Sequence, residues 1–573
     1  MPRLPLRPGV ERVADMLGRG VNVVFMAPTG YGKSKSVNYF MEAVGDRVVR
    51  AVHVLPLRAL VRELYKYYVD VLGEGYVGFV AGIRSLPRPD YSPFFLRRLT
   101  VSTIDSFALS LARLPLIELA KVSEGVSKGH YELPRMGILS SLVVFDEAHL
   151  YAESAEQAGI NPARIFLEES TGWLSSANVP VLVESATMPP SLVASLRERL
   201  GGRRAGVVVV CRKCGGPGYV RVYDREFSEL HSYEWETELV GGFHEAVEKC
   251  LEEAETGRRV LFVANTVRDA VNAYREIGRA VGDVVLVHGR LAAGDRAAAE
   301  ERIRSARVIV ATQVVEAGVD VDADVLVTAA ATPSALAQRA GRLYRSRAPS
   351  RETEPPKVYI YRPRLAAPYP GKAVNETLKQ IKDIVEARGE RIDWRLLDSG
   401  GDRKSYYELI VNVEDRYLGR HTPTPMGEAF RLMLSSCLSG LLVSSGMSLR
   451  LLNSFCSLVR PVPLVGLAVP LGGDYDVVEV SLAWLSRNTG VLDCSDGGCR
   501  ALVAVYSGGG QDYVEVTIDE QQVRRLGHAS RASLCEAYNS LVASAISRAG
   551  VSWPGPVLLL VREGVYRRGI GLV

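Results

Sequence analysis

The chain has 573 residues and a mass of 62.5 kDa, which is enough for roughly three or four domains of ordinary size. Apolar residues make up 47% and charged residues 23%, so the composition excludes a largely disordered, collagen-like or coiled-coil protein. The formal net charge is only +4, from 69 basic and 65 acidic residues. Any nucleic acid would therefore be bound in a local groove and not by a basic surface as a whole.

No apolar run near the first residue is typical of a signal peptide. The longest uncharged stretch, residues 432–449, contains six serines and two glycines. We interpret this stretch as two helices broken near residues 444–446 and not as a membrane span. The sequence therefore predicts a cytoplasmic protein with no membrane partner.

Short β-branched segments alternate with helical patterns from residue 21 to about residue 210, and the alternation restarts near residue 258. This alternation is typical of a parallel sheet with helices on both faces. The fold class predicted is α/β, with two tandem doubly wound parallel-sheet lobes. The strands predicted are residues 21–27, 48–55, 99–103, 141–146 and 179–186 in the first lobe, and 258–264, 283–289, 306–312 and 323–329 in the second.

The pattern changes after residue 345, where polar, proline-containing stretches surround one more strand candidate at 357–361. Helical and strand-like segments mix in the last 150 or so residues. We expect a first lobe at 1–205, a second lobe at 206–362, a helical linker at 363–430 and a smaller α+β accessory C-terminal domain at 431–573.

A glycine-containing loop, APTGYGKS at residues 27–34, follows the first predicted strand and precedes a helical pattern. Glycines let backbone N–H groups turn toward phosphates, a lysine reaches the β- and γ-phosphates, and a hydroxyl completes Mg²⁺ coordination. An ordinary glycine-rich turn is the alternative, since Ala27 replaces the first glycine of the strict pattern, but it leaves the lysine and serine unexplained. The residues expected to bind the triphosphate are Ala27, Thr29, Gly30, Gly32, Lys33 and Ser34.

An acidic motif, Asp146-Glu147-Ala148-His149, follows directly after a predicted buried strand. The carboxyl ends of parallel strands are where a doubly wound sheet presents its ligands. We expect Asp146 to hold Mg²⁺ together with Ser34, and Glu147 to orient or deprotonate the attacking water. An exposed acidic turn, the alternative, does not fit a position after a buried strand.

The second lobe carries arginines three residues apart in QRAGRLYR, residues 338–345. On a helix this spacing places them on one face, which is commonly a solvated face. The first lobe, however, has a phosphate site without an arginine finger. A second lobe closing over that site could supply the missing charge, which is a contribution of about 10³–10⁵ in rate.

These motifs, in this order, resemble the superfamily 2 (DEAH/DExH) helicases. Within that superfamily they are most similar to the helicase component of type I CRISPR interference. The resemblance covers roughly residues 5–350 and implies two RecA-like lobes. Besides the motifs above it rests on LPLRAL (55–60), STIDS (102–106), SAT (185–187), VANTV (263–267), HGR (288–290) and ATQVVEAGVDVDADVLVT (311–328).

The resemblance also implies roles for further residues. Gln338, Arg342 and Arg345 would contact the γ-phosphate, and Ser185 and Thr187 would couple the nucleotide to the nucleic-acid track. Gly318 and Asp320 would complete the nucleotide site. The residues implied to line the track are Arg58, Thr103, Thr266, Arg290 and Thr312.

By this resemblance the chain is an ATP- and Mg²⁺-dependent translocase on single-stranded DNA, recruited by a guide-RNA surveillance complex. No cluster of histidines and aspartates typical of an HD-type nuclease occurs, so we expect the nuclease on a separate polypeptide. The glutamine that usually reads adenine upstream of the phosphate loop is also absent. A general DNA-repair or RNA helicase, or an ATP-gated nucleic-acid clamp that unwinds nothing, are the alternatives.

Two cysteine pairs, Cys211/Cys214 and Cys494/Cys499, have a spacing that fits either half of a zinc site or a disulfide. The sequence leaves both possibilities open, and we predict no structural zinc ion from it.

Overall fold

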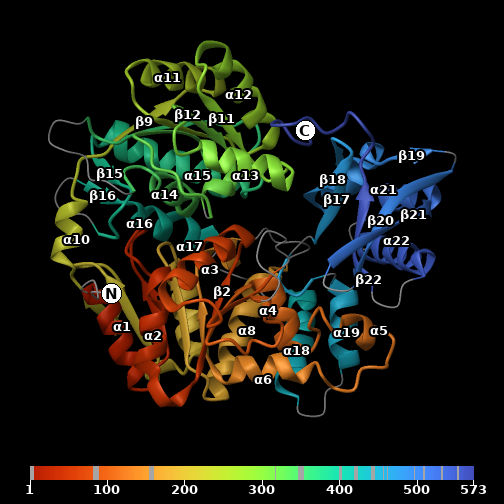
Figure 1. Ribbon diagram of the computed structural model, residues 1–573. Helices are drawn as coiled ribbons and strands as arrows, with labels where there is room; N and C mark the ends of the chain where they lie inside the picture. The colour runs from red at the N-terminus through yellow and green to blue at the C-terminus, as the bar shows by residue number, and fades with distance from the viewer. Residues whose placement is uncertain are drawn as a thin grey trace.

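Figure 1 shows the computed structural model of the chain. The residues that the structure describes are 6–81, 90–153, 160–316, 318–345, 354–398, 403–417, 424–440, 445–455, 457–460, 463–495, 497–507, 510–530, 533–550 and 554–573.

The first lobe is built on an eight-stranded parallel sheet, with strand order β3-β4-β2-β5-β6-β1-β7-β8. The sheet continues past residue 205, where we expected this lobe to end, because the valine-rich β7 pairs with β1. The strands are β1 (Val23–Met26), β2 (Arg50–Leu55), β3 (Val77–Val80), β4 (Leu99–Thr103), β5 (Ser141–Phe145), β6 (Val181–Ser185), β7 (Gly206–Val210) and β8 (Val220–Val222).

Helices cover both faces of this sheet, as predicted for a doubly wound fold. The core on one face is formed with α1 (Pro8–Gly18), α2 (Val37–Val44) and α3 (Arg58–Leu72). Alternate strand residues point to the other face, whose core involves α4 (Ile104–Leu111), α6 (Glu132–Leu139), α8 (Pro162–Ser176) and α9 (Pro190–Arg199). The shorter helices are α5 (Leu119–Ser123), α7 (His149–Glu153) and, before the second lobe, α10 (Arg225–Leu230).

The second lobe contains a six-stranded parallel sheet with strand order β11-β12-β10-β13-β14-β9, drawn at the top of Figure 1. Its strands are β9 (Glu236–Val240), β10 (Val260–Val263), β11 (Val284–Val287), β12 (Val308–Ala311), β13 (Val325–Ala329) and β14 (Lys357–Tyr361). Its helices are α11 (Phe243–Glu255), α12 (Val267–Ala280), α13 (Ala293–Arg302) and α14 (Pro333–Ala340). The predicted pair of α/β lobes is thus confirmed.

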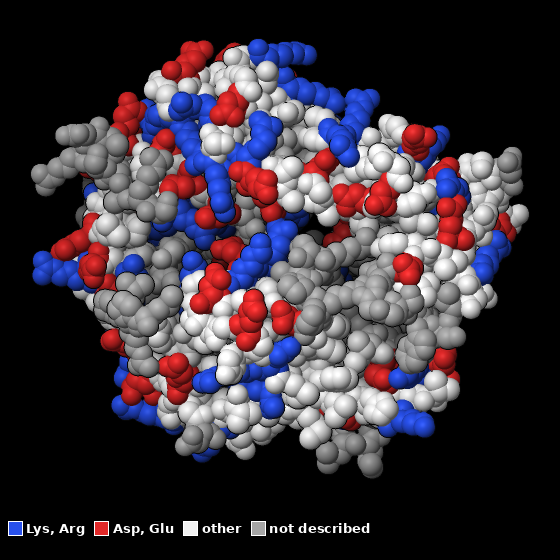
Figure 2. All heavy atoms as spheres, in the orientation of Figure 1, with Lys and Arg blue, Asp and Glu red and all other residues white. Residues whose placement is uncertain are grey.

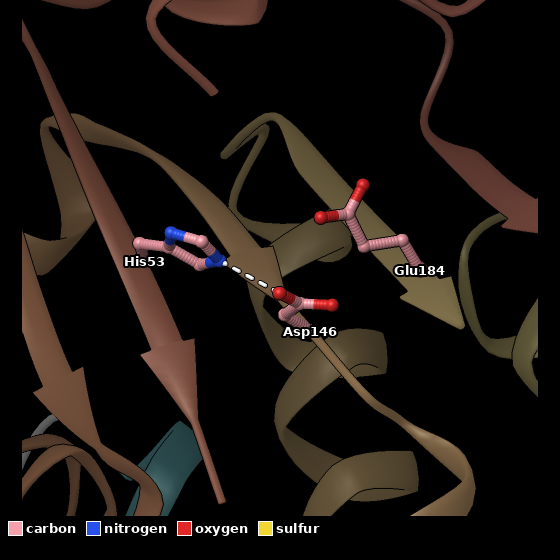
Figure 3. Close-up of side chains that lie close together, drawn as sticks. All are labelled: His53, Asp146 and Glu184. Carbon is pink, nitrogen blue, oxygen red and sulfur yellow. Dashed lines mark hydrogen bonds and ion pairs between the residues drawn. The ribbon is translucent and has the colours of Figure 1, made fainter. Parts of the chain in front are cut away.

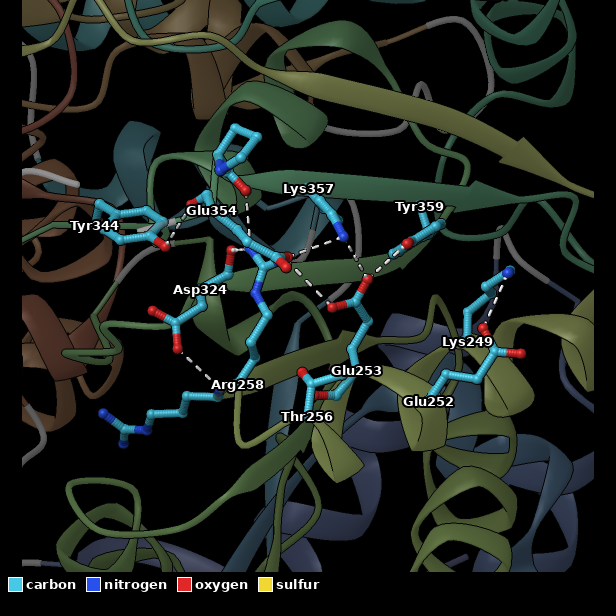
Figure 4. Close-up of polar contacts among 12 residues, drawn as sticks. Lys249, Glu252, Glu253, Thr256, Arg258, Asp324, Tyr344, Glu354, Lys357 and Tyr359 are labelled. Atoms are coloured by element: carbon cyan, nitrogen blue, oxygen red, sulfur yellow. Dashed lines mark hydrogen bonds and ion pairs between the residues drawn. The ribbon is translucent and has the colours of Figure 1, made fainter. Parts of the chain in front are cut away.

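A buried carboxylate joins α11 to β14 of the second sheet (Figure 4). Glu253 accepts a hydrogen bond from the Tyr359 hydroxyl at 2.7 Å and lies 3.3 Å from both the Arg258 guanidinium and the Lys357 amine. Arg258 also donates to the backbone oxygen of Asp324 at 3.3 Å. Two cations and a hydroxyl compensate the burial of one carboxylate here, so the network fixes α11 against β14.

The linker that we expected to be helical also contains a small two-stranded sheet. Its elements are α15 (Gly371–Lys382), β15 (Arg391–Asp393), β16 (Arg403–Ser405), α16 (Tyr406–Leu409) and α17 (Asp415–Tyr417), with π-helical turns at Asp383–Ala387 and Ile410–Glu414. The parallel pairing of β15 with β16 brings residues 391 and 403 side by side.

Helices α18 (Pro425–Ser439) and α19 (Ser445–Phe455) cover most of the described part of the long uncharged stretch, in agreement with the prediction of two helices. Residue 444, where the predicted break begins, lies outside the described residues. Arg431 pairs with Glu168 and Glu169 of α8 at 3.1 and 2.7 Å. Arg113 donates to the backbone oxygen of Gly440 at 2.8 Å, so α18 is bound to the first lobe. Among the described residues no helix is long and apolar enough to cross a membrane.

The C-terminal region forms a mixed sheet with strand order β18-β17-β22-β20-β19 and with β21 paired to β20. This sheet lies at the right of Figure 1 and fits the predicted α+β accessory domain. Its elements are β17 (Leu464–Leu471), β18 (Asp474–Ser481), α20 (Leu482–Arg487), β19 (Cys494–Ser495), β20 (Gly498–Ser507), β21 (Gly510–Asp519), α21 (Glu520–His528), α22 (Leu534–Ala549) and β22 (Pro554–Leu560).

The last residues of the chain bind the second lobe. His288 donates to the backbone oxygen of Ile570 at 2.8 Å, and the Leu572 amide donates to the backbone oxygen of Arg290 at 3.2 Å. The Tyr566 hydroxyl donates to Asp295 at 2.7 Å. These contacts place the C-terminal end beside the loop before α13.

Both cysteine pairs that the sequence left open are disulfides in the structure, one between Cys211 and Cys214 and one between Cys494 and Cys499. Cys250 and Cys437 are free and buried. The second disulfide joins β19 to β20, whose register pairs these two residues.

Alkylation of the denatured, unreduced protein should therefore modify Cys250 and Cys437 but not Cys211, Cys214, Cys494 or Cys499, because a disulfide sulfur carries no reactive thiolate. Peptide mass spectrometry before and after reduction measures this. Labelling of the four paired cysteines without reduction, or a stoichiometric zinc ion, would contradict the disulfide assignment.

Candidate active site between the two lobes

The phosphate-binding loop lies between β1 and the short 3₁₀ helix Ser34–Ser36. Gly30 and Gly32 have φ angles of +79° and +95°, a left-handed conformation that glycine adopts without strain. The Lys33 amine is buried and donates to the backbone oxygens of Ala27 and Pro28 at 2.8 and 3.1 Å. The backbone of the loop thus curves around the Lys33 amine.

Asp146 follows β5 and lies next to the loop serine. Its Oδ1 accepts the Glu147 amide at 2.7 Å, and its Oδ2 lies 3.3 Å from His53 Nε2. Burial acts to raise the pKa of Asp146, but His53, the hydroxyl of Ser34 and Lys33 outweigh it and lower the pKa. An ionised carboxylate beside a serine hydroxyl is a donor set that suits Mg²⁺, which keeps several waters.

Charged residues of both lobes influence the pKa of Glu147. Its φ of +49° is uncommon for a residue with a side chain. Burial and the charge of Asp146 raise its pKa to about 7, against the opposing charges of Lys33, Arg342 and Arg345. A carboxylate with a pKa near neutrality, facing a phosphate site, has the property required of a general base.

A chain of polar contacts runs from this carboxylate to the second lobe. His149 Nδ1 lies 3.4 Å from Glu147 Oε2 and 2.7 Å from Ser185 Oγ. The Thr187 amide donates to Ser185 Oγ at 3.2 Å, and Gln338 donates to Thr187 Oγ1 at 3.5 Å. Burial and the charge of Lys33 lower the pKa of His149 to about 3, so this ring is neutral.

The two candidate finger arginines, Arg342 and Arg345, follow α14, which ends at Ala340. The prediction that the arginines of this motif share one helix face is therefore wrong, because the chain leaves the helix in a turn at residues 341–345. Arg342 is buried and donates to the backbone oxygens of Val315 and Glu316, both at 2.7 Å. Burial, followed by the charge of Arg345, lowers the pKa of Arg342 to about 9. Arg345 pairs with Asp320 at 3.0 Å, which places Asp320 next to a finger candidate and not inside the phosphate loop.

Two glycines allow the lobes to approach closely. A Cβ atom at Gly318, whose φ is +85°, would lie 2.7 Å from the Cβ of Ala59, and one at Gly341 would lie 2.8 Å from Thr29 Oγ1. Any larger residue at either position would push the second lobe away from the phosphate loop or the helix beside it. The close approach of the lobes therefore depends on both glycines.

Sequence reasoning missed Arg395, a buried residue from the linker that touches both lobes. It donates to the backbone oxygen of Thr29 at 3.3 Å and to that of Leu343 at 2.7 Å. Its segment carries no motif, and only its place in the fold reveals the contact. It also missed the buried residues His53 and Glu184, which lie in strands that the sequence marked only as core.

The five residues expected along the nucleic-acid track fall into two groups. Arg58 pairs with Glu479 of β18, and the Arg290 guanidinium lies 4.8 Å from the ring centre of Trp484. Both arginines thus face the C-terminal domain. The remaining three are buried or cap helices, with Thr103 capping α4, Thr266 capping α12 and Thr312 buried after β12.

Basic side chains gather in the middle of the face drawn in Figure 2, near α3 and α13, and the surface is hollowed between them and the C-terminal sheet. Arg58 is the first residue of α3, and Arg290 lies in the loop before α13.

Two family models match the chain. One, for DEAD/DEAH box helicases, matches residues 8–195, and the other, for the C-terminal part of the CRISPR-associated nuclease/helicase Cas3, matches residues 256–348. The first match lies within the first lobe, and the second covers most of the strands and motifs of the second lobe.

Curated relatives of the chain are also named Cas3. The chain is 25% identical to the CRISPR-associated helicase Cas3 of Thermoproteus tenax, over 70% of this chain and 67% of that protein. It is 24% identical to a putative CRISPR-associated nuclease/helicase Cas3 of Methanocaldococcus jannaschii, over 63% of this chain and 49% of that protein. The matched part thus spans between one half and two thirds of these relatives.

Solved structures share the fold. The crystal structure of T. fusca Cas3-ATP superposes with a TM-score of 0.57 and 19% identity, over 82% of this chain and 59% of that one. A CRISPR RNA-guided surveillance complex, pre-nicking, contains a chain that matches with a TM-score of 0.51 and 19% identity, over 82% of this chain and 58% of that one. Over residues 8–195 the chain is thus similar to DEAD/DEAH box helicases, and over residues 256–348 to the C-terminal part of Cas3, as its motifs predicted, and its curated relatives are Cas3 helicases.

Proposed function

We propose that the protein is an ATP-driven translocase on single-stranded DNA that acts in the cytoplasm in CRISPR interference. The observation that carries the proposal is the position of Glu147, which is under the influence of Lys33 from the first lobe and Arg342 and Arg345 from the second. A site completed only when two lobes meet is suited to converting hydrolysis into motion. The similarity to Cas3 helicases supports the CRISPR role.

Each residue of the site has a chemical task in ATP hydrolysis. Lys33 and the loop amides bind the β- and γ-phosphates, and Glu147 orients a water and accepts its proton as the water attacks the γ-phosphorus. The bond to the leaving ADP oxygen breaks, and Arg342 and Arg345 stabilise the charge on the transferred group. Mg²⁺ held near Ser34 and Asp146 would neutralise phosphate charge.

The polar chain through His149, Ser185 and Thr187 links this chemistry to the second lobe. A change in the charge of Glu147 alters its contact with His149, and the hydrogen bonds of Ser185 and Thr187 lead from there to Gln338. We infer that this chain couples the state of the nucleotide to the distance between the lobes.

The DNA strand is proposed to pass through the hollow beside Arg58 and Arg290. Guanidinium groups suit phosphate contacts, and the Trp484 ring next to Arg290 offers a stacking surface for a base. The partners proposed are a guide-RNA surveillance complex and a nuclease on a separate polypeptide, as the family resemblance implies. A general superfamily 2 DNA-repair or RNA helicase and an ATP-gated clamp are the alternatives.

ATP hydrolysis by the full chain should rise when single-stranded DNA is added, and Lys33→Ala should lower it about 100-fold or more, because the amine no longer stabilises the transferred phosphate. Lys35→Ala, an exposed lysine two residues along, is the matched control and should retain activity. Stimulation by RNA alone would favour the RNA-helicase alternative. Indifference to any polynucleotide would contradict translocation, and DNA stimulation without unwinding of tailed duplexes would favour the clamp.

The pH dependence of hydrolysis should follow Glu147. Since a general base must be ionised and its pKa is raised to about 7, kcat/KM for ATP should fall about tenfold per pH unit below pH 7 and level off above it. Steady-state rates between pH 5.5 and 8.5 measure this. Glu147→Gln should still bind nucleotide while losing turnover, and a profile that is flat down to pH 5.5 would show that another group is the base.

Glu479→Gln should strengthen binding of single-stranded DNA, because it frees Arg58 from its carboxylate partner. An exposed ion pair of this kind contributes about 0.2–1 kcal/mol, so we expect up to about a five-fold lower Kd in a fluorescence-anisotropy titration. Glu515→Gln, which removes the partner of Arg500 elsewhere in the same domain, is the control and should leave the Kd unchanged. Unchanged or weaker binding by Glu479→Gln would place the strand elsewhere.

A further inference from the structure

Glu184 is a buried carboxylate that the proposed mechanism does not use. It lies in β6 with none of its side chain exposed, and among the described residues neither carboxylate oxygen has a hydrogen-bond partner. A buried charge is costly unless a hydrogen bond, an opposite charge or a metal ion compensates it. The fold holds this residue in the middle of the first sheet, so its surroundings indicate what compensates it.

Three neighbouring strands bring Glu184 together with His53 and Asp146 (Figure 3). The strand order β2-β5-β6 places their strands side by side. His53 pairs with Val144, two residues before Asp146, so both side chains leave the same face of the sheet. One imidazole nitrogen and one oxygen from each carboxylate all lie within 4.8 Å of one another.

The contacts of His53 determine which ring nitrogen faces the carboxylates. Tyr68 donates its only hydroxyl proton to the backbone oxygen of Ser34. His53 Nδ1, 3.2 Å from that hydroxyl, must therefore be the donor between these two groups. The other ring nitrogen, Nε2, lies 3.3 Å from Asp146 Oδ2.

A contact of this length needs either a proton on Nε2 or a metal ion between the nitrogen and the carboxylate oxygen. Metal-bound histidines commonly have this arrangement, with the second nitrogen donating its proton to a fixed acceptor. One imidazole and two carboxylates suit Mn²⁺, Fe²⁺ or Zn²⁺. With metal–ligand distances of about 2.0–2.2 Å, ligand atoms lie about 3–4 Å apart, a spacing that this cluster accommodates.

We propose that His53, Asp146 and Glu184 bind a divalent transition-metal ion without any nucleotide, in addition to the Mg²⁺ that accompanies ATP. Asp146 belongs to both sites, while His53 and Glu184 belong only to this one. The ion would hold the ends of β2, β5 and β6 together and fix the carboxylate of Asp146 toward the phosphate loop. The proposal does not depend on translocation or on the type of nucleic acid.

Electron paramagnetic resonance of the full chain titrated with Mn²⁺, without nucleotide, tests the site. We expect one bound ion per chain with hyperfine coupling to a histidine nitrogen. Glu184→Gln and His53→Gln, which keep the side-chain size close, should each raise the Kd for Mn²⁺ at least tenfold. Circular dichroism of both variants establishes that they are folded.

His244→Gln is the matched control for His53→Gln, because it changes an exposed histidine of α11 that lies outside the cluster. It should bind Mn²⁺ as the unaltered chain does. Absence of bound Mn²⁺, a signal without nitrogen coupling, or binding unchanged in Glu184→Gln would overturn the proposal. In the first case a proton and not a metal ion neutralises the cluster. If a variant fails to fold, the hyperfine coupling to nitrogen in the unaltered chain still tests whether a histidine binds the ion.

Discussion

The balance of charge around Asp146 and Glu147 is the constraint on which the rest of the structure depends. Two adjacent carboxylates are buried at the end of one strand, and both cannot be ionised without nearby cations. The first lobe supplies Lys33, and the second supplies Arg342 and Arg345. The stable arrangement of these charges therefore requires the lobes to face each other, which makes the distance between them sensitive to any added charge.

The two lobes fit closely because glycines let their backbones approach each other. Gly318 and Gly341 lie where even a methyl group would collide with the opposite lobe. Arg395 then reaches across the same gap with hydrogen bonds to one backbone oxygen on each side. Hydrogen bonds from a fixed guanidinium are directional and short in range, so they define one closed arrangement and are lost when the lobes separate.

The sequence was informative where physical requirements are local. A strand followed by glycines, a lysine and a serine indicates a phosphate-binding loop. The alternation of strands and helices indicates a doubly wound sheet. Arg395 and Glu184 escaped prediction because their importance comes only from what the fold places beside them. Arg58 and Arg290 were identified from motifs, but their contacts with Glu479 and Trp484 join segments that are far apart along the chain. The extent of the first lobe was underestimated because the sequence of β7 does not show that this strand pairs with β1 and not with a strand of the second lobe.

The C-terminal part of the chain is attached at two places that belong to different lobes. Helix α18 is bound to the first lobe through Arg431 and Arg113, while residues 566–572 are bound to the second. Any opening of the lobes changes the distance between these two anchors, so the C-terminal sheet must move relative to at least one of the lobes.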